Sequence, residues 1–132
     1  MSNINVDALT KAVSKLEEGL STYQKDPDFE LIRDGLIQRF EFTYELSHKL
    51  LRRYLRSISP NPDAIIEMNF SDLIRTANEY QLLKSDWTNW RLFREMRSKT
   101  SHTYDEDTAL EVVKGIPNFL EEAKFLLSRI SE

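Results

Sequence analysis

The spacing of apolar residues near the two ends of the chain most strongly limits the folds it can adopt. Apolar residues there recur at alternating intervals of three and four. They are Val6, Leu9, Val13, Leu16, Leu20 and Tyr23 in the first segment, and Ala109, Val112, Ile116, Phe119, Ala123, Leu126 and Ile130 in the last. This spacing is typical of helices that pack along one seam in an antiparallel bundle.

After the first of these helices, the sequence predicts one long helix, roughly from Asp28 to Ile58. The break at residues 26–28 starts it, and it ends at Ile58, because a following proline cannot continue a helix. Its main apolar stripe comprises Phe29, Ile32, Leu36, Phe40, Tyr44, Leu51, Tyr54 and Ile58. Leu31, Phe42 and Leu46 fall on a different face at about 3.6 residues per turn. We expect that second face to be buried too, against a partner chain.

The remaining segment predicts an interrupted arm. A short helical turn is expected at residues 62–68, followed by helices capped by Ser71 and Ser85. Thr103 and Glu106 fit a capping box that would start the last helix, and Pro117 predicts a kink or local break near Lys114. The sequence thus predicts an all-α fold, an antiparallel up-and-down four-helix bundle with one interrupted arm, as a single domain over residues 1–132.

Composition excludes several classes of function. The chain has no cysteine, which excludes disulfides and cysteine-ligated metal sites, and it has no glycine-rich phosphate loop. The net charge of −4 argues against indiscriminate nucleic-acid binding. No apolar run approaches the length of a membrane span, and the first residues do not resemble a signal peptide. We therefore expect a cytoplasmic protein without a membrane association.

The segment from Arg97 to Tyr104 carries the most suggestive chemistry. Arginine offers a planar fork of donors for a phosphodiester, and histidine can transfer a proton near neutral pH. A turn between the two helices could bring Arg97 and His102 to one cleft, beside the N-terminus of the last helix. The simpler interpretation is that these residues only cap and pack a helix junction.

The spacing Arg97-x4-His102-x-Tyr104 resembles the catalytic motif of HEPN-domain ribonucleases, and in particular that of HepT-type toxins. A second match supports this resemblance. The run QRFEFTYEL at residues 38–46, followed by KLL at 49–51, is similar to the second helix of the nucleotidyltransferase substrate-binding protein family, which is the same lineage. The two matches occur in order, and the resemblance covers most of the chain.

The resemblance implies a homodimeric four-helix bundle with a separate minimal nucleotidyltransferase as its antitoxin partner. It implies a metal-independent ribonuclease acting on an RNA substrate, so no metal or other cofactor is expected. By position, Arg97 and His102 would be catalytic, and Tyr104 would receive AMP from the partner enzyme, which silences the toxin. Ser98 stands where relatives often have asparagine. The alternative is a non-catalytic substrate-binding subunit of a two-component nucleotidyltransferase.

Three other groups of residues allow two interpretations each. Basic residues late in the long helix and in the row leading to Arg97 form either a track for RNA phosphates or a solvated face; they are Lys49, Arg52, Arg53, Arg56, Arg91 and Arg94. Glu45 and His48 match half of a di-iron site, although a helix-surface role is favoured. Trp87, Trp90, Phe93 and Met96 could stack bases, but their helical spacing favours the core.

Overall fold

The computed structural model describes residues 4–131 and is helical throughout this part of the chain, with no strand. The helices are α1 (Asp7–Lys25), α2 (Glu30–Ile58), α3 (Pro62–Glu67), α4 (Phe70–Glu79), α5 (Trp87–Lys99) and α6 (Glu106–Ile130). A short 3₁₀ turn, η1 (Thr100–His102), follows α5 directly. The all-α class predicted from the sequence is confirmed. No helix of the described residues combines the length and the apolar character needed to cross a bilayer.

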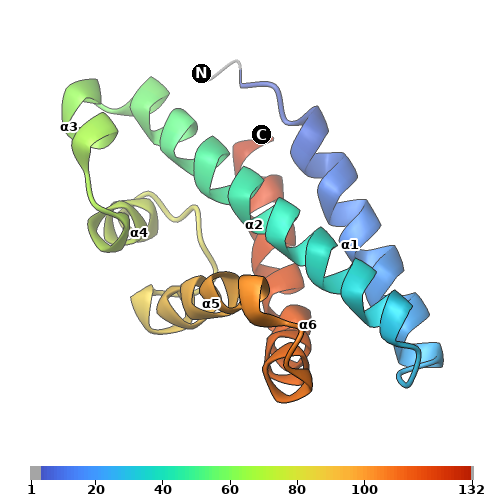
Figure 1. Ribbon diagram of the computed structural model, residues 1–132. Coiled ribbons are helices and arrows are strands. Elements are labelled where there is room, and N and C mark those ends of the chain that lie inside the picture. The colour runs from blue at the N-terminus through green and yellow to red at the C-terminus, as the bar shows by residue number, and fades with distance from the viewer. Residues whose placement is uncertain (1–3, 132) are drawn as a thin grey trace.

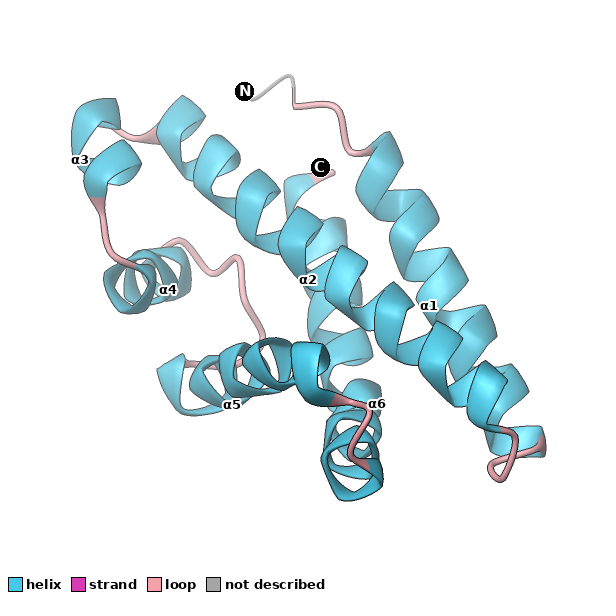
Figure 2. Ribbon diagram, viewed as in Figure 1, coloured by secondary structure: helices cyan, strands magenta, loops and turns pink. Residues whose placement is uncertain are grey.

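Helices α1 and α2 lie side by side and α6 packs against both, while α5 packs against α6 (Figure 1). The third arm of the bundle is interrupted, as expected. In Figure 2, α4 is seen along its axis and α5 from the side, so the two helices point in different directions. The loop between them leads the chain back into α5, while the buried residues of α3 and α4 belong to the same hydrophobic core as the other helices.

The predicted apolar stripes of α1 and α6 form the core. Every member of the α6 stripe is buried, and in α1 only Val6 and Tyr23, at its two ends, are partly exposed. The second face of α2 is uncovered in the single chain: Leu31 is 73% exposed and Phe42 is 60% exposed. Leu46 on that face is half-buried. The burial of this face against a partner chain, expected from the sequence, stays a prediction.

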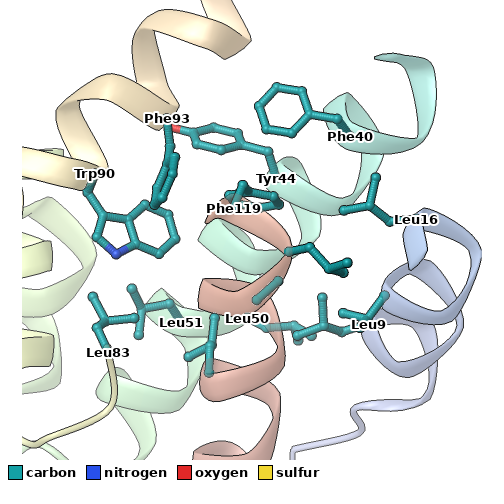
Figure 3. Packing of buried hydrophobic residues seen from close by; sticks show 14 of the residues in the cluster. Leu9, Leu16, Phe40, Tyr44, Leu50, Leu51, Leu83, Trp90, Phe93 and Phe119 are labelled. Atoms are coloured by element: carbon teal, nitrogen blue, oxygen red, sulfur yellow. The ribbon is translucent and has the colours of Figure 1, made fainter. Parts of the chain in front are cut away.

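Aromatic rings fill the centre of the bundle. Trp90 and Phe119 are fully buried, and Phe93 is 4% exposed (Figure 3). The Phe40 and Phe119 rings meet edge to face with centroids 5.0 Å apart, and the Trp90 and Phe93 rings do so at 5.4 Å. These are the favourable aromatic geometries. Core packing, rather than base stacking, is thus the role of Trp90 and Phe93.

Two predicted helix caps are displaced by one or two residues. Asn69, not Ser71, caps α4, because its Oδ1 accepts a hydrogen bond from the Asp72 N–H at 2.9 Å. Ser71 lies inside the helix, and its hydroxyl donates to the same Asn69 oxygen at 3.0 Å. Asp86 rather than Ser85 caps α5. In both helices an Asn or Asp carries the cap, which those side chains do at least as well as Ser.

Helix α6 is continuous through Pro117, so the chain does not break near Lys114; a kink there, the other form of the expectation, stays a prediction. The nearby Gly115 has a different role. A Cβ atom at Gly115 would overlap the side chain of Met96 on α5. The glycine therefore allows α5 and α6 to approach each other closely at the level of the last turn of α5.

Glu122 fixes the start of α5 from the opposite helix. Its side chain is almost fully buried on α6, and Oε2 accepts hydrogen bonds from the backbone N–H groups of Lys84 at 2.8 Å and Ser85 at 3.3 Å. A buried carboxylate is costly unless donors satisfy it, and here the loop before α5 supplies two donors to Oε2, while the buried Oε1 has no hydrogen-bond partner. This contact ties the interrupted arm to the bundle.

Candidate active site

The motif residues lie where α5 ends and the chain turns into α6. Arg97 is in the last turn of α5, His102 ends η1, and Tyr104 lies in the turn that follows. The turn closes with a hydrogen bond from the Asp105 N–H to the His102 carbonyl at 3.2 Å. Because η1 packs against both α2 and α6, this junction lies over the bundle rather than projecting from it.

Two carboxylates of α2 hold the Arg97 guanidinium. Its Nε donates to Glu45 Oε1 at 2.6 Å, and its Nη1 lies 3.3 Å from Glu41 Oε2. Glu41 and Glu45 are one helical turn apart, so their side chains share a face of α2. Arg97 remains about one-third exposed. The guanidinium is thereby oriented by fixed partners while part of it stays open to a ligand.

Thr100 completes this network. Its hydroxyl accepts a hydrogen bond from Arg97 Nη1 at 3.2 Å, and its one hydrogen has two acceptors within reach, the Arg97 carbonyl at 2.7 Å and Glu41 Oε2 at 2.8 Å. The Thr100 side chain therefore bridges the two charged groups from the first residue of η1. Rigid support of this kind is what a functional arginine needs to keep one orientation.

His102 and Tyr104, which follow Thr100 in the chain, are both exposed. Tyr104 is 87% exposed, and its ring meets the His102 ring in a T-shaped arrangement with centroids 6.1 Å apart. The imidazole and the phenol are thus neighbours on an open surface. Both side chains can be reached by a macromolecule without any movement of the core.

The last helix starts later than the capping box predicts. Thr103 has near-helical dihedral angles, and its hydroxyl donates to the Thr100 carbonyl at 3.4 Å, so it cannot serve as an extended N-cap. Asp105 is the N-cap residue, and α6 begins at Glu106, which lies 3.8 Å from Arg33 of α2 instead of reaching back to Thr103. Tyr104 therefore precedes the helix.

This later start also removes the expected anion site at the helix N-terminus. Asp105, Glu106 and Asp107 follow one another at the start of α6. Carboxylates neutralise the positive end of the helix dipole. Any anion at the junction is thus left to Arg97 and its neighbours.

Arg52 has a structural role. Its Nη1 donates to the carbonyls of Ile65 at 2.9 Å and Met68 at 2.7 Å, which fixes α3 and the start of α4 against α2. Arg53, Arg56 and Arg91 are exposed. The Arg94 guanidinium lies 5.7 Å from the centre of the Phe70 ring, a cation–π distance. Lys49 is exposed too, so Lys49, Arg53, Arg56 and Arg91 are basic candidates whose side chains remain open to solvent.

Glu45 and His48 do not form half of a metal site. Glu45 binds Arg97, and His48 Nε2 lies 3.2 Å from Arg52 Nη2 and packs edge-on against the Phe70 ring at 4.5 Å. Burial, together with Arg52, lowers the pKa of His48. Within residues 4–131, no cluster of three or more acidic or histidine side chains could hold a metal ion.

The role of Glu41 and of Thr100 was missed from the sequence, although one signal was present. Like charges one turn apart destabilise a helix slightly, so an i, i+4 pair of glutamates on an otherwise packed helix predicts a cation between them. The identity of that cation could not be read, since Arg97 lies 52 residues beyond Glu45.

Comparisons with known proteins identify the family of this chain. A sequence model described as nucleotidyltransferase substrate binding protein like matches residues 4–132. A Haemophilus influenzae protein named probable ribonuclease HepT is 42% identical over 98 residues, which are 74% of this chain and 66% of that protein. The match thus spans slightly less than two thirds of that relative.

Solved structures share the fold. One from Haemophilus influenzae, described as revealing the fold of a substrate binding domain of a nucleotidyltransferase, superposes with a TM-score of 0.90 and 34% identity. The superposition covers 97% of this chain and all of the other. A crystal structure from Thermus thermophilus has a TM-score of 0.64 and 30% identity, and covers 89% of this chain and 99% of the other.

Proposed function

This chain belongs to the nucleotidyltransferase substrate binding protein-like family, and on that premise we propose that it is a metal-independent endoribonuclease toxin of the HepT type. The observation that carries the proposal is the orientation of a partly exposed Arg97 by Glu41 and Glu45, in the same helix end and turn that presents the exposed rings of His102 and Tyr104. RNA as the substrate implies action in the cytoplasm.

The chemistry follows from the residue types. The ribose 2′-OH attacks the adjacent phosphorus as His102 removes its proton, and the bond to the 5′ oxygen breaks. A second acid protonates that leaving oxygen, which gives a 2′,3′-cyclic phosphate and a 5′-OH. Arg97 stabilises the negative charge that develops on the phosphate oxygens. Glu41 and Glu45 hold the guanidinium in place while it does so.

The need for a second proton-transfer group supports a homodimer. Each chain supplies one motif histidine, and a dimer that places two motifs in one cleft supplies both a base and an acid. His102 is exposed, so a second copy can approach it. Sedimentation across the concentration range of the cleavage assay tests this: full activity in a monomer would contradict the dimeric site.

Tyr104 is the proposed site of silencing by a partner nucleotidyltransferase. Transfer of AMP from ATP to the phenol oxygen, with release of pyrophosphate, would place a phosphodiester beside His102, where the RNA phosphate must bind. The 87% exposure of Tyr104 leaves the phenol open to a second enzyme. We expect Tyr104→Phe to cleave RNA normally and to stay active when the nucleotidyltransferase and ATP are added; silencing of that variant would refute this assignment.

The test of the main proposal is cleavage of a short tRNA-like RNA by the purified, unmodified protein in EDTA. We expect 2′,3′-cyclic phosphate ends and a rate at least about 100-fold lower for His102→Ala, the usual contribution of a general acid or base. The exposed Ser101→Ala, in the same 3₁₀ turn, is the matched control. Equal traces from wild type and His102→Ala would reject a ribonuclease.

A second function is favoured by one residue. Ser98, where relatives often have asparagine, is exposed and shorter, so it offers less reach towards a substrate. This supports a non-catalytic subunit that presents a substrate to its nucleotidyltransferase. If cleavage is absent, Ser98→Asn separates the cases: gained cleavage indicates a weakened ribonuclease, whereas no gain favours the binding subunit.

A further inference from the structure

Three adjoining hollows run along the outer face of α1 and α2. The largest, about 620 Å³, lies over the second half of α2 and includes Phe42, Glu45 and Arg56 in its wall. The next shares Phe42 with it and lies across both helices. The third shares Leu46, Lys49 and Arg53 with the first. We call this continuous depression the α1–α2 groove.

The α1–α2 groove is basic although the protein is acidic overall. Its walls contain two carboxylates, Asp7 and Glu45, against seven cationic side chains. The cations are Lys11, Lys15, Arg39, Lys49, Arg52, Arg53 and Arg56. In a chain with a net charge of −4, this segregation creates a local positive field for an anionic ligand.

The groove leads directly to the candidate active site. Glu45 lines the groove and also accepts the hydrogen bond from Arg97 Nε. Beyond Glu45, Lys49, Arg53 and Arg56 follow at successive turns of α2, about 5–6 Å apart along the helix. Phe42, with its ring 60% exposed, lies one turn on the other side of Glu45. One helix therefore connects Arg97 to a row of cations and to an open aromatic face.

We propose that the α1–α2 groove binds single-stranded nucleic acid and holds the RNA that the active site cuts. Lys49, Arg53 and Arg56 contact successive backbone phosphates, and a base stacks on Phe42. Cations that follow the backbone, together with an aromatic face on which a base can stack, are the combination that single-strand-binding proteins use. That the bound strand is RNA rests on the proposed ribonuclease function. That a single strand binds here rests on the residues of the groove alone.

Charge argues against a second copy as the occupant. A two-fold dimer places the same patch against itself, so an interface here would bring together two surfaces with an excess of five positive charges each. Such juxtaposition is unfavourable unless anions intervene. The groove therefore suits a polyanion better than it suits a copy of this chain.

The experiment measures binding without cleavage. A fluorescein-labelled eight-nucleotide single-stranded RNA, and DNA of the same sequence, are titrated by anisotropy with His102→Ala protein. Adding Lys49→Glu and Arg53→Glu should weaken binding of both strands by roughly tenfold or more and lower the salt slope by about 0.7 per lost phosphate contact. Adding Phe42→Ala should weaken binding at least about fivefold, the lower end of what base stacking contributes.

The matched control is Lys25→Glu with Lys114→Glu. Both lysines are exposed, line none of the three hollows, and give the same change in net charge. Equal losses in the groove and control variants would overturn the proposal. So would groove variants that bind RNA normally but dissociate a dimer or lose a protein partner.

The two proposals fail in different ways. If strand binding depends on Lys49 and Arg53 but the parent protein shows no His102-dependent cleavage, the binding groove is supported and the ribonuclease function is rejected. If cleavage depends on His102 but the groove variants leave RNA affinity and KM unchanged, the ribonuclease function is supported and RNA binding in the groove is rejected. Weaker RNA affinity in the groove variants, together with His102-dependent cleavage, supports both.

Discussion

The two ends of α5 differ sharply in how they are held. Near its start, Trp90 and Phe93 lie in the aromatic core and are surrounded by apolar groups. At its end, Arg97 is held only by polar contacts to α2 and to η1, and the residues after it are largely exposed. The first region is held by burial and the second by a few oriented charges. Stability should therefore depend on the first, and activity on the second.

Removing the core anchor of α5 should have the largest effect. Trp90→Ala deletes a fully buried ring, so we expect the free energy of unfolding to fall by about 3–5 kcal/mol. Urea unfolding measured by circular dichroism checks this. Trp87→Ala, at a partly buried ring on the same helix, should cost clearly less. Equal losses would mean that the two ends of the first turn are packed alike.

The loop that feeds α5 should come next. Glu122→Ala leaves the Lys84 and Ser85 N–H groups without their acceptor, and we expect a loss of about 1–3 kcal/mol. Glu121→Ala, at the adjacent exposed position, should change stability by less than about 0.5 kcal/mol. Hydrogen exchange of residues 82–86 should rise in the first variant alone. No difference between the two variants would remove Glu122 as the anchor of the arm.

Changing the polar end of α5 should separate activity from stability. Glu45→Gln weakens the orientation of Arg97, and we expect kcat for RNA cleavage to fall about tenfold, since small misplacements of a reacting group are costly. Exposed ion pairs contribute little to folding, so the unfolding free energy should change by less than about 1 kcal/mol. Glu79→Gln at the end of α4 is the control. A large loss of stability with unchanged kcat would show that this end of α5 serves folding rather than activity, which would contradict the comparison of the two ends.

The smallest effect concerns pH at the α2–α4 contact. The pKa of His48 is lowered in the folded protein from its ordinary value of 6.5, so the neutral ring is the stabilising form. That contribution is complete above about pH 6.5 and declines as the pH falls below it, because the unfolded chain then binds the proton first. His48→Gln should lose less stability than wild type between pH 7.5 and 5.5 in urea titrations. Parallel losses would contradict this assignment.

The sequence predicted the regions that local periodicity controls. The stripes of α1 and α6 and the end of α2 at Ile58 were correct, because one face of each helix must be apolar to reach the core. Caps were less predictable, since several polar residues near each helix start can occupy the N-cap position. Asn69, Asp86 and Asp105 won over the serines and the threonine that were expected.

The support of the site could not be predicted in the same way. The motif at Arg97, His102 and Tyr104 was found by resemblance, and its catalytic role stays a prediction. Its partners on α2 depend on how α2 and α5 cross, which no local pattern encodes. Arg52 illustrates the same limit. It binds the backbone carbonyls of Ile65 and Met68, and because every residue has such a carbonyl, the residue types do not predict the contact.

The close approach of α5 and α6 at Gly115 limits how related sequences can diverge. A side chain at position 115 would collide with Met96, one residue before Arg97. A larger residue at position 115 therefore requires either that the end of the Met96 side chain moves or that position 96 takes a smaller residue. We expect these positions to vary together over evolutionary time, although they stand 19 residues apart in the chain.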